Sequence, residues 1–152
     1  MTAGRVAFAA AAGLYLIGVV VQVFLAGAGL FKLTDWTAHT GLGWTLGSAP
    51  LLLLIMAFIA RPGRATILLT AALTTAAIVQ PELATARHDA PIVAALHPVN
   101  ALFVFWLAWL VARRAAVLLV EDRKRARGPA GAIPGSRTTA TPSAAPPGSR
   151  AD

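Results

Sequence analysis

The sequence has no cysteine and few charged residues. Without a thiol, the chain has no disulfide, no thiolate metal site and no covalent attachment point for a c-type haem. Charged residues make up only 12% of the chain, about half the share that a soluble domain carries on its hydrated surface. Hydrophobic residues make up 57%, so the composition excludes a soluble globular protein.

Acidic residues are especially scarce: six stand against 13 basic residues, which gives a formal net charge of +7. No hydrolytic triad, phosphate-binding loop or acid–base pair of carboxylates can be recognised, so the sequence favours a protein that is not an enzyme. The basic residues flank apolar runs instead of forming a separate basic domain. We therefore expect attraction to anionic lipid and no nucleic-acid partner.

What the chain does contain is long apolar runs, over residues 6–30, 42–60, 65–80 and 92–111. A helix needs about 20 apolar residues to cross roughly 30 Å of hydrocarbon. Turn and start signals separate the runs, at residues 61–64 and at Asp89-Ala90-Pro91. The sequence therefore predicts an all-α fold, a polytopic membrane four-helix bundle in residues 1–120, with helices at about 6–30, 35–60, 65–84 and 91–115.

Residues 121–152 are first basic and then rich in proline, alanine and serine. Such a segment cannot bury enough apolar surface to offset the entropy of ordering it. We predict a disordered cytoplasmic tail there.

Basic residues are distributed unevenly between the two ends of the predicted bundle. Lys32 and Arg87 lie at one end, together with the acidic residues Asp35, Glu82 and Asp89. The other end carries most of the remaining basic residues: Arg5, Arg61, Arg64, Arg113, Arg114, Arg123, Lys124, Arg125 and Arg127. By the positive-inside rule, we expect a multi-pass protein of the cell membrane with both termini in the cytoplasm.

The first apolar run, with Arg5 before it and Ala26-Gly27-Ala28 after it, also has features of a cleavable signal peptide. Its apolar core is longer than the roughly 7–15 residues typical of a signal. The internal repeat requires this helix as well, so we expect it to stay in the mature protein.

Two polar pairs repeat along the chain. Gln22 is followed 17 residues later by His39, and Gln80 is followed 17 residues later by His97. The pairs are offset by 58 residues, and several alanines and leucines match in the same register. Because the offset equals two helices, we predict that the bundle consists of two parallel two-helix repeats about an axis along the membrane normal.

The repeat places both histidines near the outer face, on diagonal helices, where they are expected to face each other. His39 lies above Gly43 and Gly47, a strip without side chains that either packs closely or leaves room for a flat ligand. Two facing neutral imidazoles suit the axial ligation of a haem b, with His39 and His97 on the iron. Gln22, Gln80 and Asn100 are candidate partners that orient the imidazoles or the haem edge.

Other interpretations remain open. A zinc or copper site would need Asp35 or Asp89 to complete the ligand set. The histidines are otherwise polar links between helices in a structural or interaction protein, such as a subunit of a larger membrane complex. A small transporter or proton relay would need a polar path, which the apolar cytoplasmic half does not offer. A haem protein would need a redox partner, which the sequence does not name.

The residues also carry a resemblance. The chain is similar to one half of the haem A synthase type of membrane protein. In that family each half is a four-helix bundle with a histidine on its second and fourth helix. The similar positions of this chain are Gln22-xxx-Ala26, His39, Gln80-xxx-Ala84 and His97. It also resembles a group of uncharacterised four-helix membrane proteins from actinobacteria, at residues 22–27, His39-xxx-Gly43 and residues 97–101. The matches span residues 5–115. By this resemblance, His39 and His97 are haem ligands.

The chain departs from haem A synthase in ways that bear on activity. The catalytic half of that family has a glutamate three residues before its first ligand, where this chain has Trp36, and often an arginine after it, where this chain has Thr40. The cysteines of the outer loops are missing. The resemblance therefore implies a haem-binding fold without haem A synthesis.

Overall fold

A computed structural model of the protein describes residues 3–128, and within that range the chain is helical with no strand. The helices are α1 (Ala3–Leu30), α2 (Thr37–Ala60), α3 (Arg64–Thr85), the single-turn α4 (Pro91–Ala94) and α5 (Leu96–Arg127). Four described segments are long and apolar enough to cross a membrane: α1, α2, α3 and the pair α4–α5. The predicted all-α class with four spanning helices is confirmed. The predicted tail beyond residue 128 lies outside the described residues.

The last helix is longer than the sequence suggested. α5 continues to Arg127, beyond the predicted end of the fourth helix at about residue 115. Three basic residues in its final turn interact favourably with the negative end of the helix dipole. Asp122 also accepts a hydrogen bond from the Arg5 guanidinium of α1 at 2.7 Å, and this ion pair connects the extension to the bundle.

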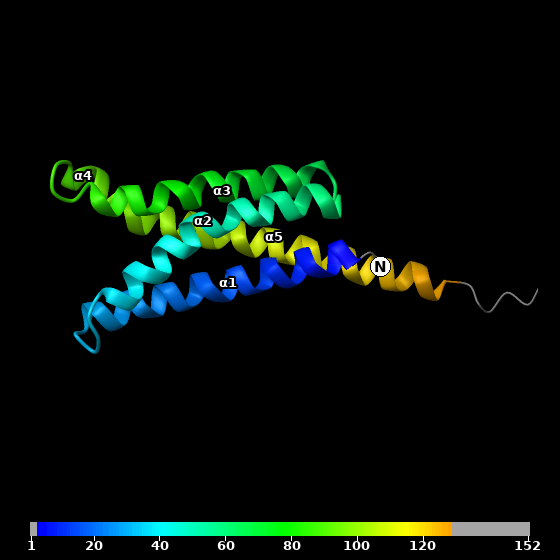
Figure 1. Cartoon of the computed structure of the whole chain (residues 1–152), viewed down its shortest axis with the longest axis horizontal. Coiled ribbons are helices and arrows are strands. Elements are labelled where there is room, and N and C mark those ends of the chain that lie inside the picture. The colour runs from blue at the N-terminus through cyan, green and yellow to red at the C-terminus, as the bar shows by residue number, and fades with distance from the viewer. Residues whose placement is uncertain (1–2, 129–152) are drawn as a thin grey trace, which may run out of the picture.

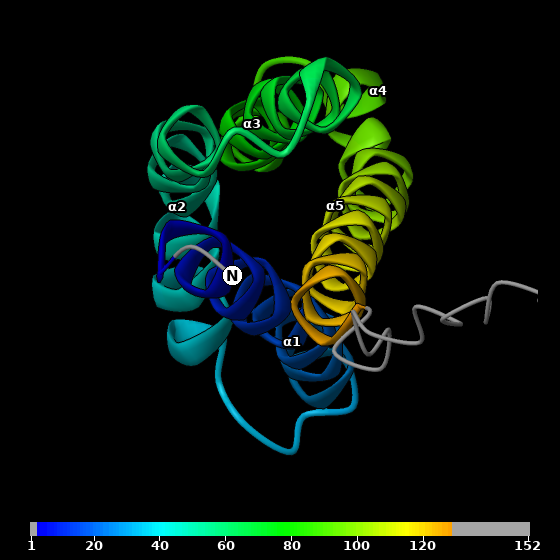
Figure 2. The same cartoon turned by 90° about the vertical axis from the view of Figure 1, so that its right-hand side faces the viewer.

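The helices form a ring in the order α1, α2, α3, α5, in which each helix packs against two neighbours (Figure 2). The diagonal pairs α1–α3 and α2–α5 do not touch through their backbones. The most deeply buried side chains lie in the half of the bundle that is nearer the termini. They include Phe8 and Tyr15 of α1, Leu53 and Ala57 of α2, Leu73 of α3, and Leu107 and Val111 of α5.

A proline bends α2 near its middle. Pro50 has no N–H, so the carbonyl of Leu46 one turn earlier lacks its usual helical partner. The Tyr15 hydroxyl of α1 donates to this carbonyl at 3.2 Å. α2 lies beside α1 at both of its ends, where Gln22 bonds to His39 and the Arg5 guanidinium donates to the Ala60 carbonyl at 3.4 Å. The second half of α2 also lies along α3 (Figure 1). This bend separates the start of α2 from α3 at the end of the bundle opposite the termini.

The outer surface of the bundle is apolar. Large hydrophobic side chains on every long helix are strongly exposed, among them Leu14, Phe24, Ile59, Leu68 and Leu102. Exposed apolar area on this scale is incompatible with water but is matched by lipid tails. The fold fits an integral membrane protein.

Candidate functional site

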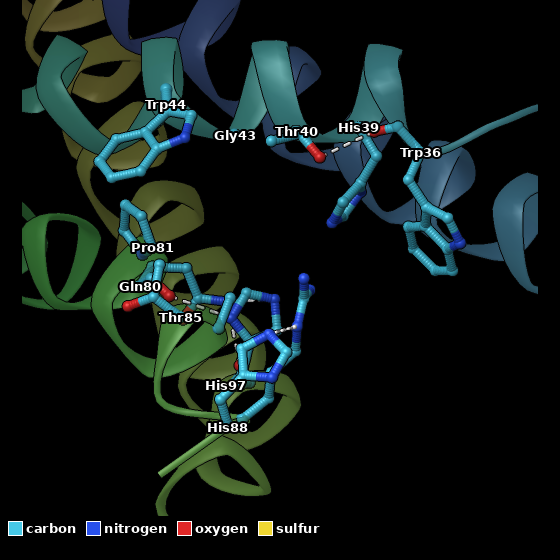
Figure 3. A pocket seen from close by; sticks show the side chains of 12 residues that line it. Trp36, His39, Thr40, Gly43, Trp44, Gln80, Pro81, Thr85, His88 and His97 are labelled. Carbon is cyan, nitrogen blue, oxygen red and sulfur yellow. Dashed lines mark hydrogen bonds between the residues drawn. The ribbon is translucent and has the colours of Figure 1, made fainter. Parts of the chain in front are cut away.

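The two histidines singled out by the sequence lie at the end of the bundle opposite the termini. His39 is in the first turn of α2 and His97 in the first turn of α5, and both are partly buried. Their side chains come from different helices and point into the same pocket (Figure 3). The start of α5 is set by local sequence: the helix is interrupted at Ala95, and Pro98 falls in the first turn of α5, where a missing N–H is tolerated.

In the first half of the chain, His39 and Gln22 are joined by reciprocal hydrogen bonds. The Nδ1 of His39 lies 3.2 Å from the backbone carbonyl oxygen of Gln22. The side-chain amide of Gln22 donates to the backbone carbonyl of His39 at 2.8 Å. The same amide nitrogen is 3.5 Å from His39 Nε2. These contacts connect α1 to α2.

The second half repeats this arrangement. The Nδ1 of His97 lies 3.0 Å from the carbonyl oxygen of Gln80, and the Gln80 amide donates to the carbonyl of His97 at 2.9 Å. The amide nitrogen is 3.4 Å from His97 Nε2. The sequence repeat at an offset of 58 residues is therefore also a repeat of atomic contacts, which here connect α3 to α5.

The hydrogen bonds assign the same tautomer to both imidazoles. A backbone carbonyl only accepts, so Nδ1 of each ring must carry the proton, and Nε2 keeps its lone pair. The glutamine amide makes its short bond to the histidine carbonyl and only a long contact to Nε2. An imidazole that donates through Nδ1 to a carbonyl and has an unprotonated Nε2 is in the tautomer of a metal ligand, and here the glutamine amide is the group that faces each Nε2.

Two cavities meet at the histidines. One, of about 350 Å³, lies between the start of α2 and the end of α3 and includes Trp36, Trp44 and Pro81 in its walls. The other, of about 630 Å³, lies between α1 and α5. His39 and His97 line both, and each volume falls in the range of roughly 300–1,000 Å³ usual for cofactor and ligand sites.

The cavities differ in chemistry. The one between α1 and α5 is walled mainly by Val20, Val23, Leu102 and Phe105, and it is almost wholly apolar. The one between α2 and α3 has Arg87 and His88 at its edge, both exposed, with the Arg87 Nε donating to His88 Nε2 at 3.1 Å. Arg87 was not among the residues predicted for the site. Arg87 is the one arginine in the sequence at this end of the bundle, and this position could have indicated that it belongs to the site.

The remaining predicted site residues act through the glutamines. Asn100 donates to the Gln80 side-chain oxygen at 2.6 Å and to the Ala76 carbonyl at 2.8 Å, and it lines neither cavity. A Cβ on Gly43 would lie 2.9 Å from the Gln22 amide nitrogen. Gly43 thus makes room for the Gln22 side chain, while it also lines the cavity between α2 and α3.

No third metal-binding side chain joins the histidines. Within residues 3–128 there is no group of three or more His, Cys, Asp or Glu side chains that could hold a metal ion. Asp35, which the sequence offered as a third ligand, accepts the Thr37 N–H at 3.0 Å at the start of α2. Trp36, just before α2, instead packs edge-on against His39, with ring centroids 5.4 Å apart.

Comparison with known proteins gives one match. Residues 22–86 match the model of a family of unknown function, DUF6220. The matched span begins at Gln22, includes His39 and Gln80, and ends before His97. No curated protein and no solved structure is significantly similar to the chain.

Proposed function

We propose that the protein binds one haem b between His39 and His97, near one face of the membrane, and serves in electron transfer or haem handling. The observation that carries the proposal is the repeated state of the two imidazoles: each donates through Nδ1 to a carbonyl, has an unprotonated Nε2 and lines the same two cavities. Neutral imidazoles in this state are the axial ligands of b-type haems, and helix bundles are common hosts for them.

The unequal chemistry of the two cavities supports a haem over a symmetric apolar ligand. A haem is a flat apolar ring with two carboxylates at one edge. The apolar cavity between α1 and α5 suits the ring, and Arg87 at the edge of the other cavity suits a carboxylate, which a guanidinium binds through paired hydrogen bonds. Gln22 and Gln80 would hold the orientation of the ligating imidazoles.

The resemblance to one half of the haem A synthase type supports the same assignment of His39 and His97. Trp36 stands where that family's catalytic glutamate would be, so haem A synthesis is not part of the proposal. A haem carrier of this kind needs a redox partner or a membrane complex to work in.

A specific observation also favours a second candidate, a structural or interaction protein without a cofactor. The glutamine–histidine pairs join α1 to α2 and α3 to α5, so the four polar side chains already hold helices together. Polar links of this type contribute to helix association in membranes. In that case the protein acts as a non-catalytic subunit, and Nε2 has no metal to bind.

The experiment is a reduced-minus-oxidised absorption spectrum of the protein purified from haem-replete membranes. We expect a low-spin b-type spectrum that is lost in His39→Ala and in His97→Ala, since each removes one axial ligand. His88→Ala is the matched control, because His88 lines the cavity between α2 and α3 without a proposed role on the iron. Its spectrum should match that of the unaltered protein.

Two results would overturn the haem proposal. The first is an unaltered protein that stays colourless after reconstitution with haem. The second is a spectrum that survives both His39→Ala and His97→Ala. A colourless protein that loses thermal stability in both variants would favour the structural candidate.

A further inference from the structure

A separate cavity lies at the other end of the bundle, near the termini. Its volume is about 370 Å³, and it is bounded by Pro62 in the turn before α3, by Thr66 in the first turn of α3 and by one face of α5. That face includes Leu110, Arg113, Arg114 and Val117. The cavity thus combines an apolar wall with two adjacent guanidinium groups, at a site to which the haem proposal gives no role.

Within residues 3–128, neither arginine has an acidic partner. In the part of the chain that the structure describes, the one ion pair joins Arg5 to Asp122. Arg113 and Arg114 are both exposed, and the Arg113 guanidinium lies over the Trp109 ring, 5.5 Å from its centroid. This contact fixes the charge beside the cavity and leaves its hydrogen-bond donors free.

The position along α5 indicates the depth of these charges. Residues 96–112, from the start of α5 to Arg113, contain no Asp, Glu, Lys or Arg. At 1.5 Å per residue this stretch is about 25 Å long, close to the roughly 30 Å thickness of the hydrocarbon core. Arg113 and Arg114 therefore come where the hydrocarbon ends, at the depth of the lipid phosphates.

We propose that this cavity binds an anionic phospholipid, with Arg113 and Arg114 on its phosphate and its acyl chain along the apolar face of α5. Basic pockets between membrane helices recognise anionic headgroups in this way. A planar guanidinium pair matches a phosphate through several parallel hydrogen bonds. The same chemistry would suit a soluble phosphate, so the test must separate the two sources.

The test is native mass spectrometry of the full-length protein in detergent, with equal amounts of dioleoylphosphatidylglycerol or dioleoylphosphatidylcholine. We expect at least tenfold more bound phosphatidylglycerol than phosphatidylcholine. Arg113→Gln/Arg114→Gln should lower phosphatidylglycerol binding to the level of phosphatidylcholine. The matched control, Arg123→Gln/Arg125→Gln, makes the same change of charge on the same helix outside the cavity and should keep most of the preference.

The conservative pair Arg113→Lys/Arg114→Lys keeps the charge. It should bind severalfold less phosphatidylglycerol than the unaltered protein, because an ammonium group does not form the paired hydrogen bonds of a guanidinium. An equal loss of phosphatidylglycerol binding in the cavity and control variants would overturn the proposal, because it would indicate diffuse electrostatic attraction between the basic helix and the lipid. So would the absence of any preference in the unaltered protein. If millimolar inorganic phosphate displaces phosphatidylglycerol, the ligand of this cavity is a soluble phosphate, and the lipid proposal is overturned.

Discussion

Gln22 and Gln80 make the same bonds to their histidines, but their side-chain oxygens differ. The Gln80 oxygen accepts from Asn100. The Gln22 oxygen is buried without a hydrogen-bond partner. In the register of the repeat, Leu42 stands 58 residues before Asn100, so the first half lacks the side-chain donor that the second half has at this position. A buried carbonyl without a donor is destabilising, so the first half is the weaker of the two polar links.

We therefore expect Gln80→Leu to destabilise the protein more than Gln22→Leu does. Both changes remove the same contacts to histidine, but Gln80→Leu also takes a partner from Asn100, whereas Gln22→Leu removes an unsatisfied oxygen. The difference should be about 1–3 kcal/mol. Unfolding of the two variants by sodium dodecyl sulfate in mixed micelles measures it. Asn100→Leu is the control, and it should cost less in the Gln80→Leu background than in the unaltered protein, because only the bond to the Ala76 carbonyl is then left to lose. Equal losses of stability in the two variants would show that the unsatisfied Gln22 oxygen does not affect the free energy of unfolding.

The sequence predicted much of the site at this scale, because the recurring glutamine–histidine spacing marks which residues meet. It did not predict the unsatisfied Gln22 oxygen, which depends on the side chain placed beside it on α2. It left Gly43 either to close helix packing or to a flat ligand, and in the structure the Gln22 amide occupies the space that the missing side chain leaves. Both details depend on how closely α1 and α2 approach each other, and hydropathy does not report that distance.

At the scale of the elements, the prolines decide where the cavity opens. Pro50 bends α2 away from α3, and Pro81 of α3 packs against Gly47, where an added Cβ would lie 3.1 Å from the proline ring. The helix spans could be placed from apolar length. The direction of a proline bend could not, because it depends on which neighbour supplies a donor to the freed carbonyl, in this case Tyr15.

Replacing Pro50 by alanine should straighten α2 and narrow the cavity. Alanine restores an N–H for the Leu46 carbonyl, which then no longer needs Tyr15. Over the roughly ten residues before Pro50, loss of a kink of about 20° moves the start of α2 toward α3 by about 5 Å. Spin labels on cysteines at positions 40 and 85, introduced into this cysteine-free chain, should report the shorter distance.

Pro62→Ala serves as the control for this change, because Pro62 lies in the turn between α2 and α3 and bends no helix. The same label distance in Pro50→Ala and in the unaltered protein would contradict the role given to the proline.

At the scale of the whole molecule, the two ends of the bundle differ in packing as well as in charge. The end near the termini holds the continuous apolar core, the Arg5–Asp122 pair and the cavity beside Arg113 and Arg114, whereas the other end holds the two cavities at the histidines. The number and class of the helices followed from composition, because lipid leaves few alternatives to a helix. The extent of α5 did not, since its last residues are polar and are held by a contact with α1 that only the folded chain supplies.

The charge asymmetry predicts that the histidine end faces away from the cytoplasm. Thr34, between α1 and α2, and Asp89, before α4, lie at that end, whereas Ala126 lies in the last turn of α5. Single cysteines at these positions need no background correction, because the chain has none of its own. A membrane-impermeant maleimide applied to intact cells should label Thr34→Cys and Asp89→Cys, and should label Ala126→Cys only after permeabilisation. The reverse pattern would place the haem candidate on the cytoplasmic side and the paired arginines in the opposite leaflet, so the positive-inside rule would fail for this chain.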